Sequence, residues 1–311
     1  MLYSPAPLHI PDGFLSFTVS ILCWVISAIT ISLAVSRSNK SLGERQIPLM
    51  GVMAAFIFAA QMINFPVAGG TSGHLLGGAL AAITLGPWAG MLVMTAVIAV
   101  QALLFQDGGL LVMGANILNM GLITVAIGYG LYRGVSNVNR TLKLTIAGIA
   151  AWLSVMAGAL FTSLQLWLSG TSQLQIVIPA MLGVHALIGV GEALITVAAL
   201  TFILQTRPDL LGSTSESARG SRGWILAGAL VSLAFVLLSP LASADPDGLE
   251  RVAEDLGFLG KGASASYQLI PDYSLPFLGT TPLSTIFAGV IGVIVVGAVI
   301  VLLGQGMKAK S

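Results

Sequence analysis

A series of long apolar runs, separated by short polar stretches, is the feature that most limits how this chain can fold. The first run, at residues 17–35, is long enough to cross the roughly 30 Å hydrocarbon core of a bilayer as a helix. With 56% hydrophobic and 8% charged residues in a length of 311, the chain has more apolar surface than one globular core can bury. The sequence therefore predicts an all-α, polytopic membrane protein.

We place spans at nine positions along the chain. They are residues 17–35, 47–64, 75–85, 88–105, 110–132, 144–168, 179–204, 224–241 and 283–303. The third piece is too short to cross the bilayer core unaided, so we predict a broken or half-buried helix that lines a cavity or packs on protein. The loop just before it, which carries His74, is therefore a candidate binding cavity. The first run lacks a preceding basic region, so we expect it to be retained as a span.

Basic residues predict the orientation of these spans. They follow the first, fifth and seventh spans and end the chain, whereas Arg251 and Lys261 lie among carboxylates between the last two spans. Cytoplasmic loops carry an excess of Lys and Arg. Nine spans then give a multi-pass protein of the cell (inner or plasma) membrane, with the N-terminus outside and the C-terminus in the cytoplasm. His9 and the His74 loop fall on the same, outer side.

The chain divides into two parts. Residues 206–223 are rich in Ser and charged residues, which is typical of a linker. We predict a transmembrane module of seven spans at 1–205, a cytoplasmic linker at 206–223 and a two-span module at 224–311. Between the last two spans lies a polar, acidic segment, which is either a functional loop or a solvated connector.

The three histidines are candidate metal ligands, because neutral imidazole is a common ligand of nickel, cobalt, copper and zinc. His9 precedes Pro11, Asp12 and Gly13, a combination that favours a turn back toward the first helix. His74 follows a glycine-rich stretch that allows the backbone to approach a ligand closely. His9 in a disordered tail and His74 as a helix-start residue at the membrane interface are the competing interpretations.

His185 and Glu192 form a second, weaker candidate. They are two helical turns apart and so share one face of the seventh span, where ionisable groups usually point toward the protein interior. A structural hydrogen bond between helices is the competing interpretation to metal ligation. Asp107 is most simply a turn residue, and many of the 37 glycines are most simply packing positions.

Several motifs in a fixed order resemble the CbiM/NikM family. They are HIPDGFLS at 9–16, GGTSGH at 69–74, LGPWA at 85–89, QALLFQDGG at 101–109 and GAN at 114–116. The resemblance covers about residues 8–205. Further on, DPDGLE at 245–250 resembles the small PDGLE domain, similar to NikN, that is fused to some members. The resemblance implies the substrate-specific membrane component of a cobalt or nickel energy-coupling-factor (ECF) ABC transporter.

The resemblance also implies a metal site made of nitrogen atoms. Transferred to this sequence, the ligands are the nitrogens of Leu8 and His9, the imidazole of His9 and the imidazole of His74. A square-planar set of four nitrogens suits Ni(II) and Cu(II) better than the tetrahedral Zn(II). The family pattern begins Met-His, whereas Met1 to Pro7 precede the motif here. We expect the true start to be position 8, with a Leu codon read as Met, and mass spectrometry of the N-terminus tests this.

The resemblance further implies partners. The sequence contains no G-x-x-x-x-G-K-[ST] phosphate loop, so we expect ATP hydrolysis on separate subunits and no enzymatic activity in this chain. The implied partners are a CbiQ/NikQ-like transmembrane coupling protein and CbiO/NikO-like ATPases, with Ni²⁺ or Co²⁺ as the transported substrate and no organic cofactor or nucleic acid. Nickel is favoured over cobalt. A stand-alone secondary transporter or channel, with Glu192 as a proton-coupling group, is the alternative.

Overall fold

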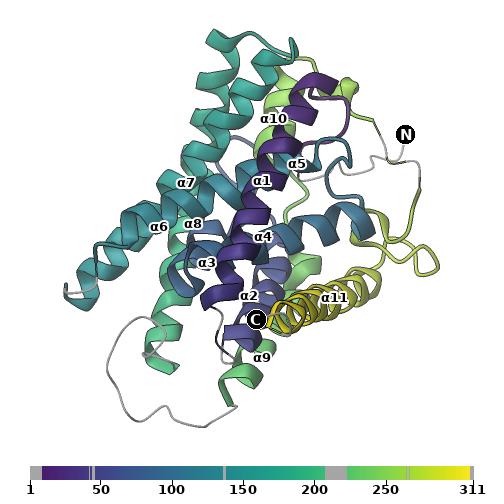
Figure 1. The fold of residues 1–311 in the computed structure, drawn as a ribbon. Helices are drawn as coiled ribbons and strands as arrows, with labels where there is room; N and C mark the ends of the chain where they lie inside the picture. The colour runs from purple at the N-terminus through teal and green to yellow at the C-terminus, as the bar shows by residue number, and fades with distance from the viewer. Residues whose placement is uncertain are drawn as a thin grey trace.

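The computed structural model describes residues 9–41, 43, 46–135, 138–206, 223–263, 265 and 267–308. Within these residues the regular secondary structure is helical apart from one short hairpin of two strands and an isolated bridge (Figure 1). The predicted all-α class is confirmed.

Helices lie at all nine positions that were predicted as spans. They are α1 (Phe17–Ser41), α2 (Gln46–Gln61), α3 (Gly78–Leu85), α4 (Pro87–Val100) continued by η1 (Gln101–Phe105), α5 (Met113–Asn116) continued by η2 (Ile117–Ile123) and α6 (Thr124–Tyr132), α7 (Arg140–Leu168), α8 (Leu174–Thr206), α9 (Gly223–Leu238) and α11 (Pro282–Lys308). Among the described residues, 7 of these helical stretches are long and apolar enough to span a membrane. The helix α2 is shorter, at 16 residues, and α3 has 8.

The short helices lie inside the bundle. Nearly every side chain of α2 and α3 is buried, because α4, α9 and α11 pack on α2 while α4, α6 and α7 pack on α3. The outward faces of α1, α8, α9 and α11 instead carry exposed Leu, Ile and Phe side chains, as expected for surfaces that contact lipid. The predicted half-buried helix after His74 is thus a fully buried one.

The helix α3 starts three residues later than predicted, at Gly78. Gly77 has a left-handed backbone (φ +83°), which interrupts the helix. The N–H groups of Leu76 and Gly77 point to Glu192 on α8 instead. Before this break, β1 (Phe65–Val67) and β2 (Thr71–Gly73) form an antiparallel hairpin that leads directly into His74.

The polar segment between α9 and α11 packs onto the protein. It contains η5 (Ser239–Leu241), α10 (Gly248–Asp255), η6 (Leu259–Lys261) and η7 (Pro271–Tyr273). The hairpin residue Ser72 donates its N–H to the Pro246 carbonyl at 2.8 Å, and Ala263 donates its N–H to the Asp12 carbonyl at 2.7 Å. The helix α10 buries Leu249, Val252 and Ala253. The solvated-connector interpretation is therefore wrong for this part of the segment.

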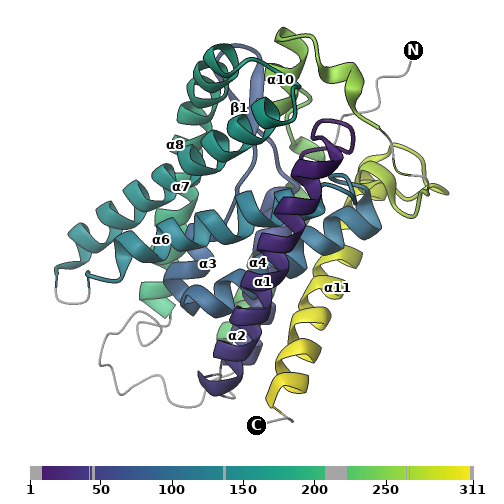
Figure 2. The same ribbon diagram turned by 45° about the horizontal axis from the view of Figure 1, so that its top comes forward.

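The two ends of the bundle differ in charge and content. The His9 segment, the hairpin and α10 gather at one end, beside the start of α1 (Figure 2). The end of α1, the helix that carries Arg37, and the end of α11 lie at the opposite end of the bundle. His9 and His74 thus share one end, as predicted, while the side of the membrane that this end faces stays a prediction.

Candidate functional site

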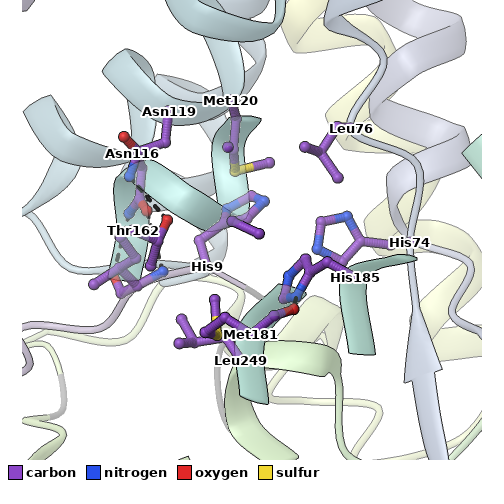
Figure 3. A pocket seen from close by; sticks show the side chains of 13 residues that line it. His9, His74, Leu76, Asn116, Asn119, Met120, Thr162, Met181, His185 and Leu249 are labelled. Atoms are coloured by element: carbon purple, nitrogen blue, oxygen red, sulfur yellow. Dashed lines mark hydrogen bonds between the residues drawn. The ribbon is translucent and has the colours of Figure 1, made fainter. Parts of the chain in front are cut away.

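All three histidines line one small cavity of about 60 Å³ (Figure 3). His9 comes from the N-terminal segment, His74 from the end of the hairpin and His185 from α8. The rest of the lining combines polar and apolar side chains, namely Asn116, Asn119, Thr162, Leu76, Met120, Met181 and Leu249. His9 is 2% exposed and His74 is 8% exposed. Segments far apart in the sequence therefore bring every imidazole of the chain to one place.

His9 is held by the loop that carries Asp107. Its backbone N–H donates to Asp107 Oδ1 at 3.2 Å, and its Nδ1 lies 3.2 Å from the Asp107 carbonyl oxygen. Within the described residues, its Nε2 is buried without a hydrogen-bond partner. Burial lowers the pKa of His9, and this effect outweighs the opposing influence of Asp107. His9 is accordingly a neutral imidazole at pH 7, and its 3.5 Å contact with the Asp107 carboxylate is not an ion pair.

The rest of the N-terminal motif is fixed by the same loop and by α5, which follows it. Asn116 accepts a hydrogen bond from the Ile10 N–H and donates one to the Ile10 carbonyl, each at 3.1 Å. The Asp12 carboxylate accepts from the N–H groups of Leu110 and Val112, also at 3.1 Å. The disordered-tail interpretation of His9 is therefore wrong, because these contacts hold residues 9–12 against the protein.

His74 faces His9 across the cavity. The two rings are 5.5 Å apart between centroids, at an interplanar angle of 72°. The Nδ1 of His74 lies 3.0 Å from the Leu75 carbonyl oxygen, so Nε2 is the nitrogen open to a ligand. A Cβ atom on Gly73 would come within 2.6 Å of Ile188, which explains why glycine precedes the histidine. His74 follows a strand and is four residues from the first residue of α3, so the helix-start interpretation is wrong.

His185 and Glu192 share a helix but not a role. His185 lines the cavity, and its Nδ1 lies 2.8 Å from the Met181 carbonyl oxygen of its own helix. Glu192 is fully buried, and its two carboxylate oxygens accept from the N–H groups of Leu76 at 2.6 Å and Gly77 at 2.9 Å. The carboxylate of Glu192 thus holds the backbone immediately after His74, which matches the structural interpretation of this residue.

The side chains alone do not make a complete metal site. Within the part of the chain that the structure describes, no three His, Cys, Asp or Glu side chains form a group able to hold a metal ion. A metal bound between His9 and His74 would need further ligands from backbone nitrogen atoms. Leu8, which was predicted to supply one, lies outside the described residues.

The cobalt uptake substrate-specific transmembrane region family, CbiM, matches residues 9–210, and the PDGLE domain matches residues 222–309. The chain is a CbiM-family protein fused to a PDGLE domain. A putative fused nickel transport protein NikMN of Archaeoglobus fulgidus is 36% identical over an alignment that covers 93% of this chain and 95% of that protein. A cobalt transport protein CbiM of Geobacter sulfurreducens is 31% identical over an alignment that covers 79% of this chain and 74% of that protein.

Solved structures agree with this membership. A crystal structure of a transition metal transporter is 33% identical and superimposes with a TM-score of 0.59, covering 68% of this chain and 100% of that one. A truncated transition metal transporter is 34% identical, with a TM-score of 0.57, over 63% of this chain and 98% of that one. The relatives are metal transport proteins, which supports the expectation that this CbiM-family chain is a transport component and not an enzyme.

Sequence reasoning missed Asp107 as part of the site. It was interpreted as a turn residue, but it is 3% exposed and contacts His9. The position of Asp107 within the QALLFQDGG motif at 101–109 was the signal in the sequence that it belongs to the site. The GAN motif at 114–116 gave the same signal for Asn116, which holds Ile10. Tyr273, which donates to Asp107 from the PDGLE domain, has no such signal.

The acidic start of α10 gives a testable pH dependence. Burial raises the pKa of Asp247 to about 8 from an ordinary value of 3.8, and the nearby carboxylates of Glu250 and Asp107 add to the effect. Between about pH 4 and pH 8 the Asp247 carboxyl is therefore protonated in the folded protein and ionised in the unfolded chain. The free energy of unfolding falls as the pH rises through this range. Because Asp247 caps α10 by accepting the Glu250 N–H at 2.7 Å, Asn can keep the cap without the charge.

We expect Asp247→Asn to remove this part of the pH dependence. Thermal unfolding of the detergent-purified protein at pH 5 and pH 8.5 measures it. The variant should gain stability over the wild type at pH 8.5 and lose that advantage at pH 5. An equal difference at both pH values would contradict the prediction.

Proposed function

We propose that this CbiM-family chain is the substrate-specific membrane component of an ECF-type ABC transporter that imports a divalent transition metal, nickel in preference to cobalt. The observation that carries the proposal is the pair of buried imidazoles of His9 and His74, with 5.5 Å between ring centroids and with a buried His9 nitrogen, Nε2, that has no hydrogen-bond partner among the described residues. Neutral imidazoles in an enclosed cavity can bind a metal and release it without leaving a net charge in the membrane protein. The names of the relatives, which include nickel and cobalt transport proteins, support the same conclusion.

The ligand set that we propose comprises the backbone nitrogens of Leu8 and His9 with the imidazoles of His9 and His74. In the described geometry the backbone N–H and Nδ1 of His9 both contact Asp107. Chelation by both atoms therefore requires Asp107 to give up these contacts when the metal enters. The Nε2 of His9 is available without that change. His185 lies at the cavity wall outside this set, and Glu192 positions the His74 loop.

The proposed organisation follows the two matched domains. We assign residues 1–205 to the metal-binding module, 206–223 to a cytoplasmic linker and 224–311 to the PDGLE module. We propose that the protein lies in the cell (inner or plasma) membrane. Metal enters from the outer side, at the end of the protein that carries His9. A CbiQ/NikQ-like coupling protein and CbiO/NikO-like ATPases then supply the energy for release to the cytoplasm, where the C-terminus lies.

The first test is metal binding by the detergent-purified full chain. Elemental analysis and isothermal titration with Ni²⁺ and Co²⁺ should show one metal per chain, with tighter binding of nickel. Failure to bind either ion would contradict the metal site, and tighter binding of cobalt would reverse the proposed preference.

The second test separates an ECF component from a stand-alone transporter. Nickel uptake is measured in cells that express the chain with the coupling protein and ATPases, and in cells where an ATPase carries an inactivated phosphate loop. We expect uptake only with active ATPases. Full uptake by the chain alone would overturn the ECF assignment and favour a secondary transporter or channel.

A further inference from the structure

A second cavity lies at the seam between the two matched domains, away from the histidines. It has a volume of about 350 Å³ and is bounded mainly by α2, α8 and α9. Every side chain that lines it is apolar or aromatic except that of Thr206. Among the described residues α9 packs on α2 and α11 but hardly touches α8. The space that this arrangement leaves between α8 and α9 is the cavity.

The cavity is a slot that runs parallel to these helices. On α9 its lining residues are Trp224, Gly228, Val231 and Phe235, which recur every three or four positions and so share one helix face. On α8 the lining falls within residues 195–206. Twelve residues of helix, at 1.5 Å per residue, give the slot a length of roughly 16 Å. The hydrocarbon core of a bilayer is about 30 Å thick, so the slot has the depth of one leaflet.

The two ends of the slot differ. At one end Phe56 on α2 and Phe235 on α9 meet edge to face, with 5.3 Å between ring centroids and an interplanar angle of 76°. At the other end lie Thr206, the last residue of α8, and Trp224, the second residue of α9. Tryptophan is enriched where a membrane meets water. The slot therefore extends from the membrane surface to a closed end near the middle of the bilayer, which is the path of a phospholipid acyl chain.

The slot is continuous with the lipid-facing surface of the protein. Phe202 lines the slot from α8 and is 40% exposed, and Ala198 beside it is exposed as well. On α9, Leu226 and Leu230 are 63% and 56% exposed. A cavity of about 350 Å³ spread over this length is too narrow for a helix about 10 Å across. A single acyl chain from the surrounding bilayer fits both the shape of the slot and its apolar walls.

We propose that the slot binds one acyl chain of a phospholipid, and that this lipid packs α9 of the PDGLE module against α8 of the CbiM-family module. An empty slot would leave its lining side chains without contacts on one side, and filling it restores those contacts. The chemistry that recognises the lipid is apolar and acts on the chain. The inference goes beyond the proposed function and does not depend on which metal the histidines bind.

The test fills the slot with a side chain. Ala198 lines the slot and is exposed, so Ala198→Phe can place a ring there without displacing buried protein atoms. Ala229→Phe is the matched control, because Ala229 is an exposed alanine on α9 that does not line the slot. Native mass spectrometry of the detergent-purified full-length chains counts the phospholipids that each retains. Thermal unfolding is then followed as dioleoyl phosphatidylcholine is added.

We expect the wild type and Ala229→Phe to retain one phospholipid per chain. Their unfolding temperatures should rise with added lipid and then level off, because the lipid binds the folded protein. Ala198→Phe should retain none and should unfold at a temperature that added lipid does not change. Equal retention by Ala198→Phe and the wild type would overturn the inference, as would a wild type that retains no phospholipid and does not respond to it.

Trp224 gives a second measurement that needs no filled slot. A phospholipid with brominated acyl chains quenches tryptophan fluorescence on contact, and the Trp224 signal is the part that Trp224→Phe removes. We expect this part to be quenched at about one added lipid per chain in detergent. Quenching that only grows in proportion to bulk lipid, without saturation, would mean that Trp224 meets lipid at the surface alone and would overturn the inference even if Ala198→Phe failed to fold.

Discussion

Alanine at His74 is expected to abolish stoichiometric nickel binding, and alanine at His9 should do the same. These imidazoles face each other across the cavity, with 5.5 Å between ring centroids. Each is proposed to supply a ligand that His185, the third imidazole of the cavity, does not replace, because within the described residues no three His, Cys, Asp or Glu side chains form a group able to hold a metal ion. Outer-shell changes alone cost about 10–100-fold in metal affinity, so loss of a ligand should cost more than about 100-fold.

His185→Ala is the matched control for these two variants. It removes an imidazole from the same cavity wall, but the Nδ1 of His185 is engaged by the Met181 carbonyl and no proposed ligand depends on it. Isothermal titration of all three variants should therefore separate His185→Ala, with near-normal stoichiometry, from the other two. If His185→Ala loses binding and His74→Ala retains it, the metal lies on α8 and the ligand assignment is wrong.

The broad features of the fold could be predicted because the bilayer imposes them. Apolar runs of sufficient length become helices in lipid, and the short run after His74 could not span, so both features followed from segment length. The grouping of His9 and His74 at one end followed from the number of helices between them. Their contact in one cavity could be expected from the family resemblance and not from spacing.

The features that could not be predicted from the sequence are those that depend on contacts between residues far apart in the chain. The sequence suggested a helix from residue 75, but Glu192, more than 110 residues away, captures the Leu76 and Gly77 N–H groups and delays α3. Asp107 looked like a turn residue because a turn explains an Asp-Gly-Gly stretch by itself. Tyr273 stands in a polar segment whose packing depends on contacts with the other module. In each case a local explanation was sufficient, so nothing in the residue pattern indicated a distant partner.

Glu192 links α8 to the break before α3, and this explains how the irregular backbone after His74 can be buried inside a helical membrane protein. Irregular backbone there needs partners for its N–H and C=O groups, since lipid offers none. The carboxylate of Glu192 accepts the N–H groups of Leu76 and Gly77, and Gln61 on α2 donates to the Leu76 carbonyl at 2.8 Å. The backbone directly after His74 is thus held from two helices.

Glu192→Ala is accordingly expected to destabilise the protein by roughly 2–6 kcal/mol, because it leaves two buried N–H groups without acceptors at about 1–3 kcal/mol each. Nickel binding should weaken as well, since His74 is two residues from the first of these groups. Glu192→Gln keeps one acceptor oxygen and should lie between the alanine variant and the wild type. Thermal unfolding in detergent, followed by nickel titration, measures both effects.

Thr196→Val is the matched control, one helical turn further along α8. Thr196 is fully buried like Glu192, but its hydroxyl has no hydrogen-bond partner within the described residues. Replacing an unpaired hydroxyl by a methyl group of the same shape should be neutral or slightly stabilising. Equal unfolding temperatures for Glu192→Ala and Thr196→Val would mean that the loop finds other acceptors. Lower stability of Glu192→Ala with undiminished nickel binding would mean that His74 is positioned by the hairpin alone.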